Sequence, residues 1–344
     1  MIGHPLVIAV LVLDLLALGF ALSAAPPWLG VLLEWAPDGS GARQLRLEAS
    51  LEAASLGTRW AVGLFGLGSL LLLVGVTGVL PDLVPGAMCG TGVLLATEGL
   101  GERALALRGF ALAALWVWQT LDHLNRAAPR PPAIPLEARW HLLSLPLLGY
   151  AAWSTFRALL QLDPHQPVSC CQALYSSTAA TAEGAAPLGL PAAAWLALFF
   201  GGLVALPLLT ALSGLLKARR RALHGALLAT ALVWLPAAVV TLSQHLAAYH
   251  YGVLHHHCPW CLFLGEHHAV GYPLFAALLL IGLEALAGFT TATAAAHHDA
   301  LAAPAARRLR RSRWVVLGAW LVFALLALGP AIAWRVEHGV WMSG

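Results

Sequence analysis

Long apolar runs recur along the chain and dominate its pattern of hydrophobic and polar positions. A helix needs about 20 mostly apolar residues to cross the hydrocarbon core of a bilayer. Such runs predict transmembrane helices over residues 4–24, 60–80, 104–123, 140–161, 188–215, 223–248, 269–288 and 314–335. The fourth is the weakest, because Arg157 lies inside it. We therefore expect an all-α fold, a polytopic membrane helix bundle of about eight transmembrane helices, with residues 1–344 as one integral membrane domain.

The N-terminal part needs two further expectations. No Lys or Arg precedes the first apolar run, whereas a secretory leader normally begins with one. We therefore expect residues 4–24 to be a retained helix. In the longer loop that follows, residues 43–58 predict a short interfacial helix, with Arg43, Arg46, Glu48 and Glu52 on its wet face.

Composition supports a membrane protein. Hydrophobic residues make up 60% of the chain and charged residues 10%, whereas a soluble domain is about 25% charged. The surface that charges would otherwise cover must face lipid, so the bilayer is the first predicted partner. The net charge is only +3, and the basic residues are not interleaved with aromatic ones. Nucleic acid is therefore not an expected partner.

Basic residues predict the orientation, because cytoplasmic loops retain Lys and Arg. With the N-terminus outside, 15 of the 19 basic residues lie in inner loops: Arg43, Arg46, Arg59, Arg126, Arg130, Arg139, Lys217, Arg219, Arg220, Arg221, Arg307, Arg308, Arg310, Arg311 and Arg313. Moving the helix count by one destroys this partition. We expect both termini on the extracytoplasmic side of a bacterial inner (cytoplasmic) membrane, and a functional face on that side.

The cysteines all fall in outer loops of this topology. The loops are residues 81–103, 162–187 and 249–268, and the cysteines are Cys89, Cys170, Cys171, Cys258 and Cys261. None lies in the middle of a span, where a small apolar thiol would simply be packing. This distribution indicates a chemical role.

Histidines follow the same pattern, and 10 of the 15 lie outside or at the outer interface: His4, His165, His245, His250, His255, His256, His257, His267, His268 and His338. Five of them flank the sequence C-P-W-C, which runs from Cys258 to Cys261. We take His250 and Glu266 as auxiliary candidates beside Cys89.

Thiol–disulfide redox chemistry is the leading interpretation. Cysteines two residues apart often have a lowered thiol pKa, and neighbouring protonated imidazoles stabilise a thiolate further. Cys258 and Cys261 are then the exchanging pair, with Cys170 and Cys171 as the relay or resolving pair. A disulfide between adjacent residues is strained and therefore labile. Cys170 or Cys171 bonding to Cys89 or to the C-P-W-C is the other possibility. The expected partner is an extracytoplasmic redox protein.

This plan resembles that of DsbB-type and vitamin K epoxide reductase-type membrane oxidoreductases. Those families place two cysteine pairs at the outer surface of a helix bundle, next to a quinone. The resemblance implies a quinone as the electron acceptor. It extends to the plan alone, because eight predicted helices is a larger number than those families have and the loop motifs do not align.

A soft-metal site is the rival interpretation. Thiolates select ions such as Cu(I) or Zn²⁺, and imidazole also binds Cu and Zn. A tetrahedral set with two sulfur and two nitrogen ligands would combine Cys258 and Cys261 with two of the neighbouring imidazoles, those of His255, His256, His257, His267 and His268. A metal explains the many histidines, whereas disulfide exchange explains the separated cysteine pairs. The partner would then be a metal-carrier protein.

Two plainer interpretations remain. The C-P-W-C segment is then a structural disulfide, and the chain is a structural subunit of a membrane complex. Asp14 is an auxiliary candidate, because ionisable groups inside spans are expensive. It would serve a proton path or a hydrogen bond to a neighbouring helix.

Overall fold

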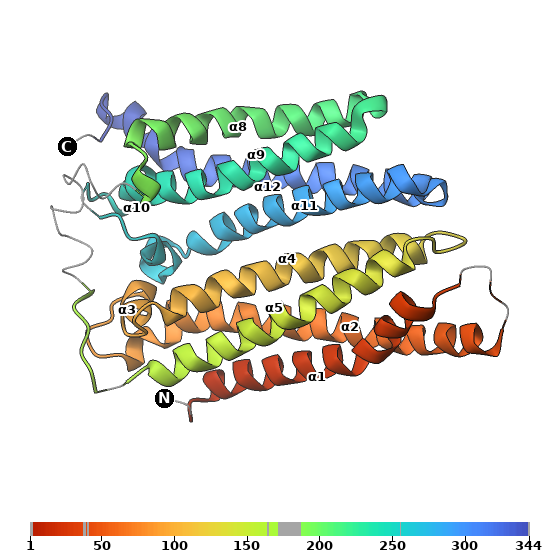
Figure 1. Cartoon of the computed structure of the whole chain (residues 1–344). Coiled ribbons are helices and arrows are strands. Elements are labelled where there is room, and N and C mark those ends of the chain that lie inside the picture. Colours follow the sequence, from red (N-terminus) through yellow and green to blue (C-terminus); the bar gives the residue numbers. More distant parts are fainter. Residues whose placement is uncertain are drawn as a thin grey trace. The chain divides into compact units, whose positions relative to one another are not determined.

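The computed structural model describes residues 3–36, 39, 41–163, 165–170, 187–254 and 256–342. These residues form helices and connecting turns, and no strand occurs among them. Figure 1 shows that the chain consists mainly of long helices. The expectation of an all-α fold is confirmed for this part of the chain.

Seven helical segments in the described residues are long and apolar enough to cross a membrane: Pro5–Glu34, Ala42–Val79, Leu100–Arg126, Ala192–Leu215, Arg220–Tyr251, Gly271–His297 and Asp299–His338. The remaining long helix, α5 (Ile134–Gln161), is not among them. It contains the predicted fourth span, the one weakened by Arg157. Helices of this kind indicate an integral membrane protein, whereas the count of eight and the orientation stay predictions.

Two compact units can be distinguished by their internal contacts. Unit 1 comprises residues 1–84, 93–166 and 290–309, and unit 2 comprises residues 85–92, 167–289 and 310–344. The helices α11 (Gly271–His297) and α12 (Ala302–His338) contribute to both units. A single integral membrane domain over residues 1–344 stays a prediction.

Four long helices build most of unit 1. They are α1 (Pro5–Glu34), α2 (Ala42–Val74, extended by a π-helical turn, Gly75–Val79), α4 (Leu100–Arg126) and α5. Helix α1 packs along α2 and α5, and α4 packs along α5. The predicted interfacial helix at residues 43–58 is wrong as a separate element, because these residues are the first part of the continuous α2.

Small residues allow the unit 1 helices to pack closely. Ala17, Ala61, Ala111 and Ala151 are all 0% exposed and surround Phe65. Membrane helices depend on such small side chains, because lipid supplies no hydrophobic drive for helices to associate.

Unit 2 is built on α8 (Ala192–Leu215), α9 (Arg220–Thr241) and parts of α11 and α12. Its core is aromatic: Trp234 stacks with Phe199 and meets Phe323 edge-on. The Trp234 Nε1 donates to the Phe199 carbonyl over 2.9 Å. A side chain at Gly202 would begin 2.1 Å from the Trp234 ring, so the glycine makes room for it.

The connection between α9 and α11 carries the C-P-W-C sequence. Helix α9 continues through a π-helical turn, Leu242–Leu246, into α10 (Ala247–Tyr251). Gly252, with a φ of 64°, ends α10 in the left-handed conformation that glycine favours. Two 3₁₀ turns follow, Pro259–Phe263 and Gly265–His267, before α11 begins. Short α3 (Gly90–Leu95) starts directly after Cys89.

Candidate functional site

Four cysteines from three loops meet in one buried cluster of unit 2. Cys89, Cys170, Cys258 and Cys261 are 0%, 1%, 1% and 5% exposed, and all are free thiols. The Sγ atoms of Cys89, Cys258 and Cys261 lie within 4.8 Å of one another. The Cys89 and Cys258 sulfurs are 3.5 Å apart. The structure thus brings together four of the five cysteines that the sequence singled out.

A short backbone link places Cys170 beside Cys89. The Val168 N–H donates to the Pro85 carbonyl over 2.9 Å. Between Pro85 and Cys89, Gly86 has a φ of +79°, and a Cβ there would lie 2.2 Å from the Val168 oxygen. Only glycine allows this approach without displacing backbone. The link therefore ties the segment that contains Cys89 to the segment that ends at Cys170.

The C-P-W-C turn is held from two sides. Cys258 precedes the 3₁₀ turn as its N-cap, and Pro259 occupies the first position, where a missing N–H does no harm. The Tyr251 hydroxyl donates to the Cys258 carbonyl. The Trp260 ring packs against Gly90, where a Cβ would lie 2.8 Å from the ring. The residue after Cys89 therefore has to be small, so that the loops can approach.

The surroundings of Cys258 favour its thiolate. The side chains of Cys261 and Cys89 donate to it, the Thr91 hydroxyl lies 3.0 Å from its sulfur, and the Cys261 backbone N–H also donates. These donors outweigh burial and lower the Cys258 pKa from 9.0 to about 3. Hydrogen bonds thus favour the thiolate at Cys258, which is one of the four buried cysteines.

The thiol form is favoured at Cys261 and at Cys170. Hydrogen bonding to Cys258 and Cys89, followed by burial, raises the pKa of Cys261. Burial is also the main reason why the pKa of Cys170 is raised. Removing further protons from the cluster therefore requires a compensating positive charge.

Among the residues that the structure describes, histidines flank the cluster without joining the three sulfurs. Tyr251 stacks on His256 with ring centroids 4.2 Å apart, and it meets His267 edge-on at 4.5 Å. Burial lowers the pKa of both imidazoles, so the neutral forms are favoured. His256 also lies within electrostatic range of Cys89. It is a neighbour of the cluster that the sequence did not distinguish from the other histidines.

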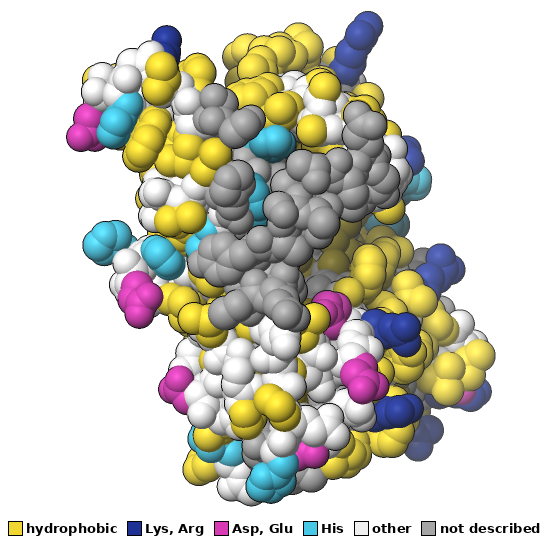
Figure 2. Space-filling model, turned by 90° about the vertical axis from the view of Figure 1, so that its left-hand side faces the viewer, with side chains coloured by type: hydrophobic (Ala, Val, Ile, Leu, Met, Phe, Trp, Pro, Cys, Tyr) yellow, Lys and Arg dark blue, Asp and Glu magenta, His cyan; other side chains and the backbone are white. Residues whose placement is uncertain are grey.

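The remaining predicted residues lie in varied places. His257 and His250 are half-buried in unit 2, and Glu266 and His268 are exposed. Figure 2 views the end of the molecule drawn at the left of Figure 1, where several histidine side chains are at the surface. Cys171 and His255 lie outside the described residues.

Asp14 belongs to unit 1, and it pairs there with Arg108. The two groups form two hydrogen bonds of 2.6 and 2.8 Å, and both side chains are 3% exposed. Arg108 also donates to Ser69 and Thr155. Of the two roles considered for Asp14, this geometry favours a bond to a neighbouring helix. Arg108 was missed, although a basic residue inside a predicted span signals a buried partner.

Sequence reasoning also underrated Cys89 and missed Thr91 and Tyr251. Cys89 was only an auxiliary candidate, yet its sulfur lies 3.5 Å from that of Cys258. Thr91 lies two residues after it and reaches the same sulfur. The positions of Cys89 and Thr91 in the chain indicated only that the two residues share a loop.

The arrangement offers soft donor atoms that converge from separate loops. Three sulfurs face a common centre, and burial excludes water from it. Such a set can bind a thiophilic ion or exchange disulfides internally. No protein-family model, curated protein or solved structure matches this chain.

Proposed function

We propose that this is an integral membrane protein that binds a soft transition-metal ion, Cu(I) or Zn²⁺, through Cys89, Cys258 and Cys261. The observation that carries the proposal is the mutual approach of three buried Sγ atoms to within 4.8 Å. For metal–sulfur bonds of about 2.3 Å, ligand sulfurs lie about 3.8 Å apart in a tetrahedral site. The Cys89–Cys258 separation of 3.5 Å is close to that value.

Charge supports the same proposal. One thiolate, that of Cys258, is stabilised by hydrogen bonds, whereas the pKa of Cys261 is raised. A bound cation would supply the missing positive charge, and binding would release the remaining thiol protons. Thr91 and the Cys261 N–H would then be the groups that hold the ligand sulfur in place.

Cys170 distinguishes the two metals. It belongs to the buried cluster and interacts with Cys89, but it is not one of the three mutually close ligands. Three thiolates suffice for Cu(I), whereas a closed Zn²⁺ site normally has four ligands, and Cys170 would be the fourth. The positive-inside pattern supports an extracytoplasmic site, where a metal-carrier protein would be the partner.

The test measures metal on the full-length protein, purified in detergent under reducing conditions and then loaded with Cu(I) or Zn²⁺. We expect about one ion per chain. Cys89→Ser, Cys258→Ser and Cys261→Ser should each lose it. Cys171→Ser is the matched control and should retain it. Loss on Cys170→Ser would indicate Zn²⁺, and retention would indicate Cu(I). A wild-type protein that binds neither ion would refute the proposal.

Thiol–disulfide exchange is the second candidate, and the lowered pKa of Cys258 favours it, since a thiolate is the attacking species. Closing a disulfide between the Cys258 thiolate and a neighbouring thiol releases two electrons and one proton. A quinone is the proposed electron acceptor, and it would take its second proton from solvent. Thiol trapping on the same samples separates the candidates. Metal-free protein whose Cys258 is isolated in a reducible disulfide would favour redox chemistry, whereas free thiols with bound metal would exclude it.

A further inference from the structure

Unit 1 contains a pocket that is separate from the residues of the proposed metal site. Its volume is about 430 Å³, and it lies where α1, α2, α4 and α5 meet. Apolar walls come from Trp28, Leu51, Leu56, Pro131 and Ile134. Pockets of this size and mixed character hold small organic ligands, in which a few polar groups determine specificity.

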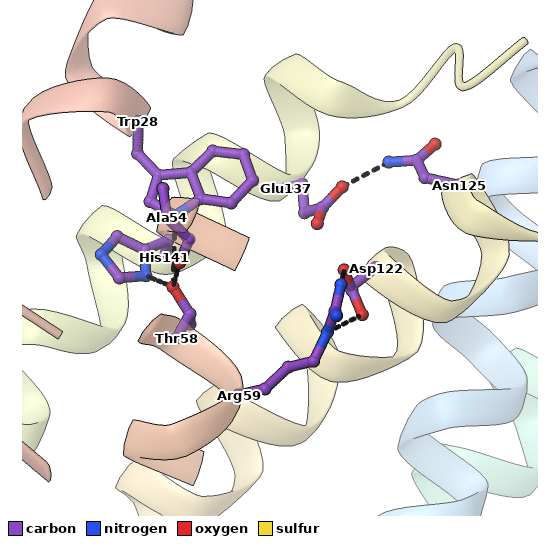
Figure 3. A network of polar contacts seen from close by, with 8 residues as sticks. All are labelled: Trp28, Ala54, Thr58, Arg59, Asp122, Asn125, Glu137 and His141. Carbon is purple, nitrogen blue, oxygen red and sulfur yellow. Dashed lines mark hydrogen bonds and ion pairs between the residues drawn. The ribbon is translucent and has the colours of Figure 1, made fainter. Parts of the chain in front are cut away.

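Polar side chains from three helices form the floor of the pocket. Arg59 of α2 donates twice to Asp122 of α4, over 2.9 and 2.6 Å. Asn125 of α4 donates to Glu137 of α5 over 2.5 Å. Asp122, Asn125 and Glu137 are each 3% exposed. Figure 3 shows Asp122 and Glu137 facing the same space, with the Trp28 ring on the neighbouring helix.

Negative charge exceeds positive charge around this pocket. Three acidic residues line it, Glu52, Asp122 and Glu137, against the two basic residues Arg59 and Arg126. Arg59 is already committed to Asp122. Glu137 has an amide partner, Asn125, and also contacts the Asp122 carboxyl group. Burial is the main cause that raises the pKa of Glu137 to about 8, and the neighbouring Asp122 carboxyl group adds to it, so Glu137 carries a proton near neutral pH.

We propose that this pocket binds a lipophilic organic cation beside Asp122 and Glu137, in place of the proton on Glu137. A monovalent cation matches the excess of one negative charge. The Trp28 ring offers an aromatic wall for it, and Leu51 and Ile134 offer aliphatic ones. The exchange is balanced: one ligand cation enters and one proton leaves to solvent.

Proton competition gives the proposal a definite pH dependence. The groups that face the carboxyl pair are Arg59 and the rim residue Glu52 from α2, and Arg126 at the rim from α4. One turn further along α5, His141 is bound to Thr58. Helix α1 lines the pocket only with Trp28. Because the ligand requires deprotonated Glu137, its affinity should rise with pH until Glu137 has lost its proton.

Tetraphenylphosphonium is a suitable probe for the full-length protein in detergent. Calorimetry should give a saturable site, with about one proton released per cation in buffers of different ionisation enthalpy. Glu137→Gln retains the Asn125 contact and should weaken binding by about tenfold or more. Glu102→Gln, an exposed carboxylate at the start of α4, is the matched control and should leave affinity unchanged.

Three results would overturn the proposal: no saturable binding to the wild type, affinity that does not change with pH, or equal affinity in Glu137→Gln. The pH series uses wild-type protein alone, so it decides the question even if a variant fails to fold. Metal content measured in parallel should stay unchanged in Glu137→Gln, so this result is independent of the proposed function.

Discussion

At the scale of single residues, hydrogen bonds decide which sulfur of the cluster is the reactive one. Four cysteines share one buried environment, yet the donors from Thr91, Cys89 and Cys261 converge on Cys258. Burial alone would favour thiols at all four positions. Donor placement therefore decides which residue becomes the thiolate.

Thr91→Val tests this assignment, because it removes one donor with little change in volume. We expect metal affinity to fall by about 10- to 100-fold, as for other groups that support a metal ligand. In metal-free reduced protein, we expect the ultraviolet absorbance of the Cys258 thiolate to persist in the wild type far below pH 9.0. During acidification, the variant should lose this absorbance at a higher pH than the wild type does. Thr120→Val, whose hydroxyl bonds only the carbonyl of Trp116 in its own helix, is the control.

At the scale of elements, unit 1 is joined by polar contacts between helices as well as by small side chains. Asp14 connects α1 to Arg108 of α4, which also reaches α2 through Ser69 and α5 through Thr155. The guanidinium carbon of Arg108 also lies 4.5 Å from the centroid of the Phe65 ring. A single buried guanidinium therefore links α4 to the other three long helices of the unit.

Asp14→Asn should destabilise the protein markedly, because it leaves this guanidinium buried without a counter-charge. Breaking a buried ion pair in this way costs about 3–5 kcal/mol. Thermal unfolding in detergent measures the effect, with Glu34→Gln as the control. Glu34 pairs with the exposed Arg43 at the end of α1, and solvent-exposed pairs of this kind contribute little to stability. Asp14→Leu combined with Arg108→Met should recover much of the loss. Equal effects of Asp14→Asn and Glu34→Gln would contradict this account.

At the scale of the whole molecule, the basic residues predict the topology. The connection at residues 216–219 begins the strongly basic segment ahead of α9, whereas residues 252–268 carry no Lys or Arg. Alkaline phosphatase fused after Arg219 should therefore be inactive in cells, and the same enzyme fused after Gly252 should be active. The reverse pattern would place the cysteine cluster on the cytoplasmic side and exclude an extracytoplasmic carrier as its partner.

Helix positions and the lipid-facing character followed from the sequence, because apolar length and charge depletion are properties of the chain itself. The weakness of the fourth span was visible in the same way, from Arg157. Helix ends were less predictable: α1 reaches Glu34 and α2 begins at Ala42, well beyond the apolar runs. An apolar run predicts only the part of a helix that lies within the lipid. The end of the helix depends on packing outside the lipid.

The sequence by itself determined that the cysteines lie outside the long apolar runs and that polar groups lie within the helices. Only the tertiary structure decided which of them meet. Cys89 and Cys258 are 169 positions apart, and Asp14 and Arg108 are 94 apart. No local periodicity relates such distant residues. Helix packing and the close approaches at Gly86 and Gly90 bring side chains together, so the contacts that carry the chemistry arise only in the folded chain.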